Sequence, residues 1–177
     1  MGKESNIRPI AESKESSLTW TQLKLGRHRY HELAGEGKVF ASLKWENLFG
    51  SLAICATSDR KFSFNRPGFL VHRQITVRRL DIDDDVATMR MGILGKATLE
   101  FTNGISYSFR RIGLSGADWQ FIDSSGRLVC TIHGEGKLGS LRGKVVFEKE
   151  AKKLKDVTLL ASLGWYMIVL IAEDSSP

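Results

Sequence analysis

Apolar residues recur in short runs along most of the chain, from residue 18 to residue 150, and Gly, Asp, Asn or Ser separates one run from the next. The runs are rich in β-branched and aromatic residues and are interrupted about every ten positions, which is typical of an antiparallel sandwich or barrel. The pattern predicts about twelve strands, at residues 19–25, 28–33, 38–45, 50–56, 60–65, 69–79, 86–91, 96–101, 105–110, 117–122, 127–133 and 144–149. The predicted fold class is therefore mainly β.

The stretch KATLEFTNGISYSFR, residues 96–110, predicts how two of these strands pair. A two-residue turn at Asn103 and Gly104 would mix apolar and polar side chains on both faces of the hairpin. A three-residue loop, 102–104, separates them, because a shift of one residue exchanges the two faces, and it places Gly104 at a positive φ. The apolar face then pairs Phe101 with Ile105, Leu99 with Tyr107 and Ala97 with Phe109, and the polar face pairs Glu100 with Ser106, Thr98 with Ser108 and Lys96 with Arg110.

The segment 157–172 contains no charged residue, and its apolar side chains would surround a helix on every side, as in a helix that is buried all round. At 1.5 Å per residue it would be about 24 Å long, shorter than the ~30 Å hydrocarbon layer of a bilayer. A closed sheet of about twelve strands is wider than the roughly eight whose interior side chains can fill. We therefore predict an antiparallel β-barrel that encloses this C-terminal hydrophobic α-helix. A tail-anchored membrane protein is the alternative, because lysines precede the segment and acids follow it.

The polar, Ser- and Glu-rich residues 1–17 show no period and predict a disordered tail, so that residues 18–174 form a single barrel domain with its central helix at 157–172. The first residues lack the apolar core of a signal peptide. Cys55 and Cys130 lie within apolar strands, which predicts reduced, buried thiols in a cytoplasmic protein, with a disulfide between them as the alternative.

The ending LLASLGWYMIVLIAED and the strand pair RKFSFNRPGFLVHRQITVR, together with the number of strands, resemble the tubby C-terminal-like superfamily. This superfamily includes tubby proteins, phospholipid scramblases and LURP-one-related proteins, and the resemblance covers residues 18–174. It implies a barrel threaded by a central helix. No run matches the phosphoinositide-binding residues of tubby proteins position by position. The Pro-rich and Cys-rich segments of the scramblases are not found either.

The net charge is +6 and the isoelectric point is about 9.4. Residues 1–17 carry equal numbers of acidic and basic side chains, and residues 157–177 carry acids without lysine or arginine, so the positive excess belongs to residues 18–156. Such an excess favours anionic partners, and arginine can bind phosphate through two nitrogens. The predicted lipid- or anion-binding residues are Arg27, Arg29, Arg66, Arg73, Arg78, Arg79, Arg110 and Arg111.

From these arginines we expect a non-enzymatic protein that binds anionic phospholipid peripherally, at the inner membrane surface, through the barrel wall. The alternatives are a protein-interaction scaffold with no lipid role, and a barrel whose basic residues only keep it soluble. Nucleic acid is not expected as a partner, because no recognition helix or base-stacking aromatic motif accompanies the charge.

Three further patterns predict no chemistry. The run Gly134-x-Gly136-x-x-Gly139 matches a dinucleotide fingerprint in form only, since another strand rather than a helix follows it. The acidic residues 81–85 lack the Gly and Glu of a calcium-binding loop, which predicts a solvated turn. The four histidines (His28, His31, His72 and His133) have no metal-ligand spacing. We therefore expect no metal, no cofactor and no catalytic residue.

Overall fold

The computed structural model describes residues 6–25, 28–48, 50–68, 74–92, 95–113, 117–136 and 140–175. Of the predicted site residues, Arg27 and Arg73 lie outside this part of the chain.

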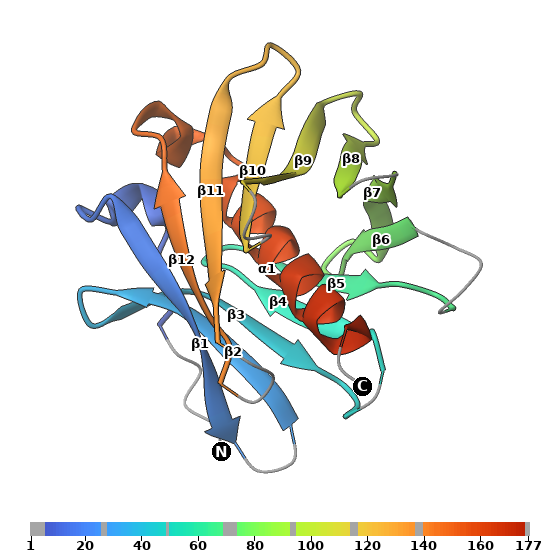
Figure 1. Ribbon diagram of the computed structural model, residues 1–177, viewed down its shortest axis with the longest axis horizontal. Helices are drawn as coiled ribbons and strands as arrows, with labels where there is room; N and C mark the ends of the chain where they lie inside the picture. Colours follow the sequence, from blue (N-terminus) through green and yellow to red (C-terminus); the bar gives the residue numbers. More distant parts are fainter. Residues whose placement is uncertain are drawn as a thin grey trace.

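Twelve antiparallel strands close into one barrel, which confirms the predicted fold class (Figure 1). Each strand pairs with its neighbours in the sequence, and β12 pairs with β1 to close the barrel. The strands are β1 (Ser17–Leu25), β2 (His28–Gly35), β3 (Lys38–Trp45), β4 (Ala53–Ala56), β5 (Lys61–Asn65), β6 (Gln74–Arg79), β7 (Asp84–Met91), β8 (Lys96–Phe101), β9 (Ser106–Ile112), β10 (Asp118–Asp123), β11 (Leu128–Glu135) and β12 (Arg142–Phe147).

The hairpin of β8 and β9 has the register that the apolar pattern predicts. Leu99 lies opposite Tyr107, Ala97 opposite Phe109, and Lys96 opposite Arg110. The backbone N–H of Phe101 donates to the carbonyl of Ile105 over 2.8 Å, and Gly104 adopts a φ of +88°. The face that carries Leu99 and Phe109 is buried, because these residues belong to the core of the barrel.

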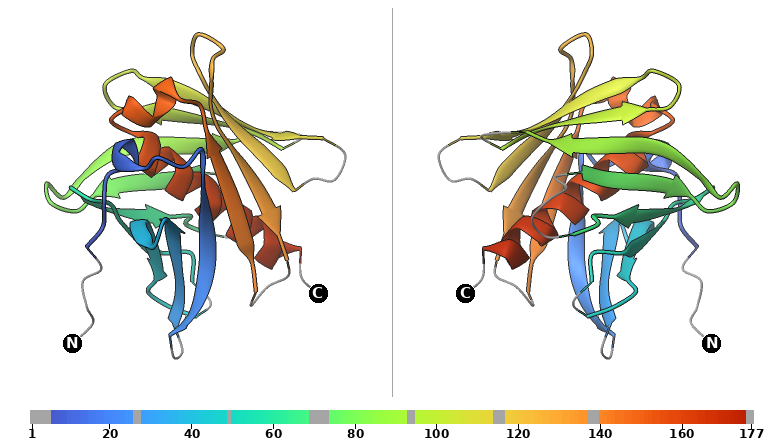
Figure 2. Two further views of the ribbon diagram at one scale, coloured as in Figure 1. Left: turned by 90° about the vertical axis from the view of Figure 1, so that its left-hand side faces the viewer. Right: turned by 90° about the vertical axis from the view of Figure 1, so that its right-hand side faces the viewer.

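The C-terminal helix α1 (Val157–Asp174) runs obliquely through the barrel and is buried along most of its length (Figure 2). It ends two residues later than predicted, so that Glu173 and Asp174 belong to its last turn. By length and composition α1 could also cross a membrane, but 72% of it is buried inside the barrel. The apolar character of this segment is thus accounted for by the core.

Glycines allow α1 to approach the inner wall closely. A Cβ at Gly164 of the helix would lie 2.5 Å from Cδ1 of Ile132 and 2.9 Å from Cε2 of Phe121. A Cβ at Gly143 of β12 would overlap the indole ring of Trp165. Real Cβ atoms do not make contacts this short, so the wall and the helix fit because these two positions have no side chain.

We call the two open ends of the barrel the entry mouth and the exit mouth, according to where α1 begins and ends. The entry mouth, where α1 begins, is the end at which the even-numbered strands finish and the odd-numbered strands start. The exit mouth, where α1 ends, is formed by the opposite strand ends. It carries Arg29 of β2, residues 46–48 and 50–52 between β3 and β4, and Arg66 after β5.

The residues before β1 differ from the predicted disordered tail in their described part, residues 6–16. They include the short 3-10 helix η1 (Ile10–Glu12), whose Ile10 is only 1% exposed. The backbone N–H of Arg8 donates to the carbonyl of Val39 over 2.8 Å. Lys152, in the 3-10 helix η2 (Glu150–Lys153), donates to the carbonyl of Ser13 over 3.2 Å. Burial of one isoleucine and these backbone contacts hold the segment on the barrel, although its composition is polar.

Candidate functional site

Arg78 and Arg79, at the end of β6, are bound by the acidic turn that follows them. Arg78 donates to Asp83 through Nε over 2.9 Å and to Asp85 through Nη1 over 3.0 Å. Arg79 forms two hydrogen bonds with Asp81, of 2.7 and 2.6 Å. These bonds lower the pKa of Asp81 and of Asp83. The exposed turn of residues 81–85 thus neutralises the two arginines that precede it.

Arg29 and Arg66, at the exit mouth, bind the last turn of α1. Arg29 forms an ion pair with Glu173, and Arg66 binds both carboxylate oxygens of Asp174, at 2.7 and 3.1 Å. Arg29 also donates to the carbonyl of Gly50 over 2.5 Å. Two acids in the last turn oppose the helix dipole, whose C-terminal end is negative. The two arginines compensate for this and hold the end of the helix in the barrel.

Arg29 is mostly buried by these contacts. Its guanidinium carbon lies 4.9 Å from the ring centroid of Trp45, and its side chain is 13% exposed. Burial lowers the pKa of Arg29 to about 10. A side chain held in this way supports the fold, and its guanidinium has little surface left for a lipid headgroup.

Arg110 and Arg111, on β9, are exposed and point to opposite faces of the wall. Arg110 lies on the outer face, opposite Lys96 of β8 and Gln120 of β10. Arg111 lies opposite Trp119 at the rim of the exit mouth, where a Cβ on Gly95 would touch its Cβ at 3.2 Å. Among the described residues, no acid forms an ion pair or hydrogen bond with Lys96, Arg110 or Arg111. We call these three residues the basic patch.

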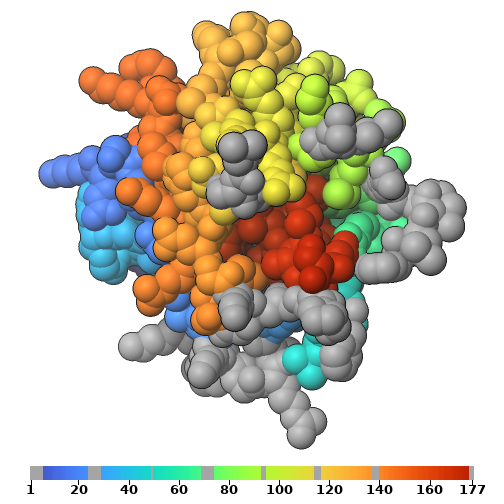
Figure 3. Space-filling model, viewed as in Figure 1, coloured from blue at the N-terminus to red at the C-terminus, as the bar shows by residue number. Residues whose placement is uncertain are grey.

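Apolar side chains are exposed at the same end of the barrel. Leu48 is 48% exposed and Leu52 is 37% exposed, in the segment between β3 and β4. The space-filling view shows atoms of the C-terminal half of α1, in red, reaching the surface on the face seen in Figure 1 (Figure 3). Ile171 and Ala172, in the last turns of α1, are partly exposed. The exit-mouth end thus combines unpaired positive charge with apolar surface.

The histidine His31 is a core residue rather than a surface one. It is 1% exposed, and Nε1–H of Trp165 donates to its Nδ1 over 3.0 Å. Burial, and next the charge of Arg29, lower the pKa of His31 to about 4. His133, on the outer wall, forms a 2.9 Å contact with Asp118. His28 is described by its backbone, and His72 lies outside the described residues.

The two cysteines and the first part of the glycine run have the structure predicted for them. Cys55 and Cys130 are buried free thiols, and burial raises the pKa of each to about 12. Such thiols are poor nucleophiles, because the thiolate is the reactive form. Within the part of the chain that the structure describes, no three metal-binding side chains gather at one point. Gly134 lies in β11, and the next element after Gly136 is strand β12, as predicted. Gly139 lies outside the described residues.

Lys96 is the member of the basic patch that was not among the predicted site residues. The predictions used clusters of arginine along the sequence, whereas Lys96 is fourteen positions from Arg110 and stands alone. The signal was present in the hairpin register, which already placed the two residues opposite each other.

Comparison of the chain with protein-family models, with curated proteins and with solved structures gave no match.

Proposed function

We propose that the protein binds anionic phospholipid peripherally, with the exit-mouth end of the barrel against the inner membrane surface. The observation that carries the proposal is the pair Lys96 and Arg110, which lie directly opposite each other on neighbouring strands, both exposed. Like charges in such a pair repel each other. An anion bound between them would remove this repulsion, and a lipid phosphate can accept hydrogen bonds from both.

The surroundings of the patch support the same proposal. The acids at the end of α1 are bound by Arg29 and Arg66, so they do not offset the basic patch. Leu48 and Leu52 offer exposed apolar side chains at the same end, which can enter the headgroup layer. Each Lys or Arg near an anionic membrane surface contributes about 1 kcal/mol of binding free energy, and salt weakens this attraction.

Co-sedimentation of the full chain with vesicles tests the proposal. We expect binding to phosphatidylcholine vesicles that contain phosphatidylserine, little binding to phosphatidylcholine alone, and weaker binding at high salt. Replacing both Lys96 and Arg110 by Gln removes two charges near the membrane, which predicts roughly 10- to 30-fold weaker binding.

The matched control replaces Arg78 and Arg127 by Gln. It removes the same charge from two exposed residues that are already paired with acids at the entry mouth, and we expect it to bind nearly as the unchanged chain does. If both double variants lost the same amount of vesicle binding, the membrane would be attracting the net charge of the protein rather than a particular site. Equal binding to vesicles with and without phosphatidylserine would overturn the proposal. It would favour the alternative of a protein-interaction scaffold, which would gain support if the variant with Lys96 and Arg110 replaced still bound a protein partner.

A further inference from the structure

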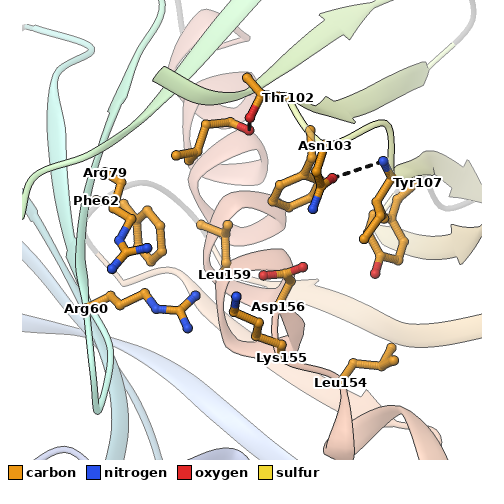
Figure 4. Close-up of a pocket in the computed structure, with 13 residues that line it drawn as sticks. Arg60, Phe62, Arg79, Thr102, Asn103, Tyr107, Leu154, Lys155, Asp156 and Leu159 are labelled. Atoms are coloured by element: carbon orange, nitrogen blue, oxygen red, sulfur yellow. Dashed lines mark hydrogen bonds between the residues drawn. The ribbon is translucent and has the colours of Figure 1, made fainter. Parts of the chain in front are cut away.

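A pocket of about 310 Å³ opens at the entry mouth, at the opposite end of the barrel from the basic patch (Figure 4). Strand ends of β5 to β9, the residues just before α1 and the first turn of α1 form it. Its volume is at the lower limit of pockets that bind small molecules. Part of its wall is apolar, from Phe62, Val86, Phe101, Ile105, Leu154 and Leu159.

The apolar wall runs from the core to solvent. Phe62 and Leu159 are 4% and 2% exposed and form the buried part, whereas Ile105 and Leu154 are 45% and 38% exposed at the rim. A continuous apolar surface of this kind leaves area in contact with water, and covering it is favourable. A ligand with one apolar chain fits this surface.

Three cationic side chains and one acid also line the pocket: Arg60, Arg79, Lys155 and Asp156. Arg60 is held by Asp59 through Nε, at 3.1 Å. Within the described chain, its two terminal nitrogens and the ammonium group of Lys155 have no hydrogen-bond partner. Figure 4 shows these nitrogens directed toward the space beside Leu159. Helix α1 begins at Val157, and its positive N-terminal end faces the same space without a side-chain cap.

Asp156 is the one acid among the residues that line the pocket. It is partly buried, and no described residue donates a hydrogen bond to its carboxylate. Burial raises the pKa of this carboxyl, against the opposing charges of Lys155 and Arg60. Arg79 is bound by Asp81 and Arg60 is bound by Asp59 through Nε. The donors that remain for a ligand are therefore the two terminal nitrogens of Arg60 and the ammonium group of Lys155, with Asp156 beside them.

We infer that this pocket binds a single-chain amphipathic carboxylate, that is, a free fatty acid of short or medium chain. The carboxylate lies between Arg60 and Lys155 near the start of α1, and the chain lies along Phe101 and Leu159 toward Ile105. Arginine binds a carboxylate through two parallel N–H donors, and the charge on both partners strengthens these bonds. The site is separate from the basic patch and does not depend on the proposed membrane binding.

Titration of the full chain with octanoate, 1-octanol and acetate, followed by calorimetry, tests the inference. Octanoate carries both the charge and the chain, octanol lacks the charge, and acetate lacks the chain. We expect saturable binding of octanoate, about tenfold weaker binding of octanol, and no measurable binding of acetate. Equal affinity for octanoate and octanol, or no saturation by octanoate, would overturn the inference.

Matched variants locate the ligand. Arg60→Gln and Lys155→Gln should each weaken octanoate binding about tenfold and leave octanol binding unchanged. Lys153→Gln is the control, because Lys153 is an exposed lysine two positions away that does not line the pocket. Ile105→Ser should weaken the binding of both ligands. Equal effects of the Lys153 and Lys155 variants would contradict the assigned site, and a urea midpoint for each variant verifies that it remains folded.

Discussion

His31 is held inside the barrel as a neutral imidazole. Its Nδ1 accepts a hydrogen bond from Trp165, so that this nitrogen carries no proton. Protonation would require breaking this bond and placing a charge in the core near Arg29. This cost lowers the pKa of His31 to about 4. Because the pKa differs between the folded and unfolded chain, the stability of the protein depends on pH.

The free energy of unfolding should fall as the pH drops from about 6.5 to about 4. In this window the unfolded chain protonates His31 and the folded chain does not, so the slope is up to about 1.4 kcal/mol per pH unit and the total about 3 kcal/mol. Above pH 6.5 both states are neutral at this residue and its contribution is complete. Urea denaturation at several pH values measures the slope. His31→Gln removes the titrating group and should flatten it, whereas parallel curves for the two chains would contradict this assignment.

The helix and the wall make contact through positions that admit no side chain. Gly164 costs the helix about 1 kcal/mol relative to alanine in intrinsic propensity, but here it allows α1 to pack against Ile132, Phe109 and Phe121. At such a position, the free-energy cost of overpacking by a new side chain should exceed the gain in helix propensity.

Gly164→Ala should therefore destabilise the protein, because an added methylene in a packed core costs typically 1–3 kcal/mol, and Gly164→Asp should prevent folding by burying an unpaired charge. Gly50→Ala is the matched control: its Cβ would meet Asn47 at an ordinary 3.4 Å, and its φ is not positive. Midpoints of urea unfolding compare the variants. If the Gly164→Ala protein were as stable as the unchanged chain, the barrel wall would be shown to accommodate the added methyl group without loss of stability.

Local sequence patterns were sufficient to predict most of the secondary-structure elements. Period-two alternation and turn residues located the strands, and the register of Leu99 with Tyr107 followed because only one register separates apolar from polar side chains. The N-terminal segment was harder to predict, since the burial of Ile10 depends on a contact with distant parts of the chain and leaves no periodic pattern.

The barrel as a whole depends on its helix. Twelve strands enclose more space than their own side chains fill, and α1 contributes large buried residues to that space, including Leu160, Leu163, Trp165 and Tyr166. The aromatic rings of Trp20 and Trp45 stack on Trp165 and Tyr166 of the helix. Without α1 the inner faces of the strands would be in contact with water.

Deletion of residues 157–177 should abolish cooperative folding and cause aggregation, because the apolar inner wall loses its partner. Size-exclusion chromatography and urea unfolding followed by circular dichroism measure the outcome. A monomeric fragment with a cooperative transition would show that the barrel closes without its helix.

The sequence specified the strands, one hairpin register and a mainly apolar helix, because all of these depend on residues that are close along the chain. The ion pairs of Arg78 with Asp83 and Asp85 are of the same local kind, five and seven positions apart. The environment of Arg29 was decided by the closed barrel, which brings it to Glu173, 144 positions away, and the pocket beside Arg60 and Lys155 likewise exists only after closure. A periodic pattern determines which face of a strand is buried, but closure of the barrel determines which charges meet, and therefore which remain free to bind.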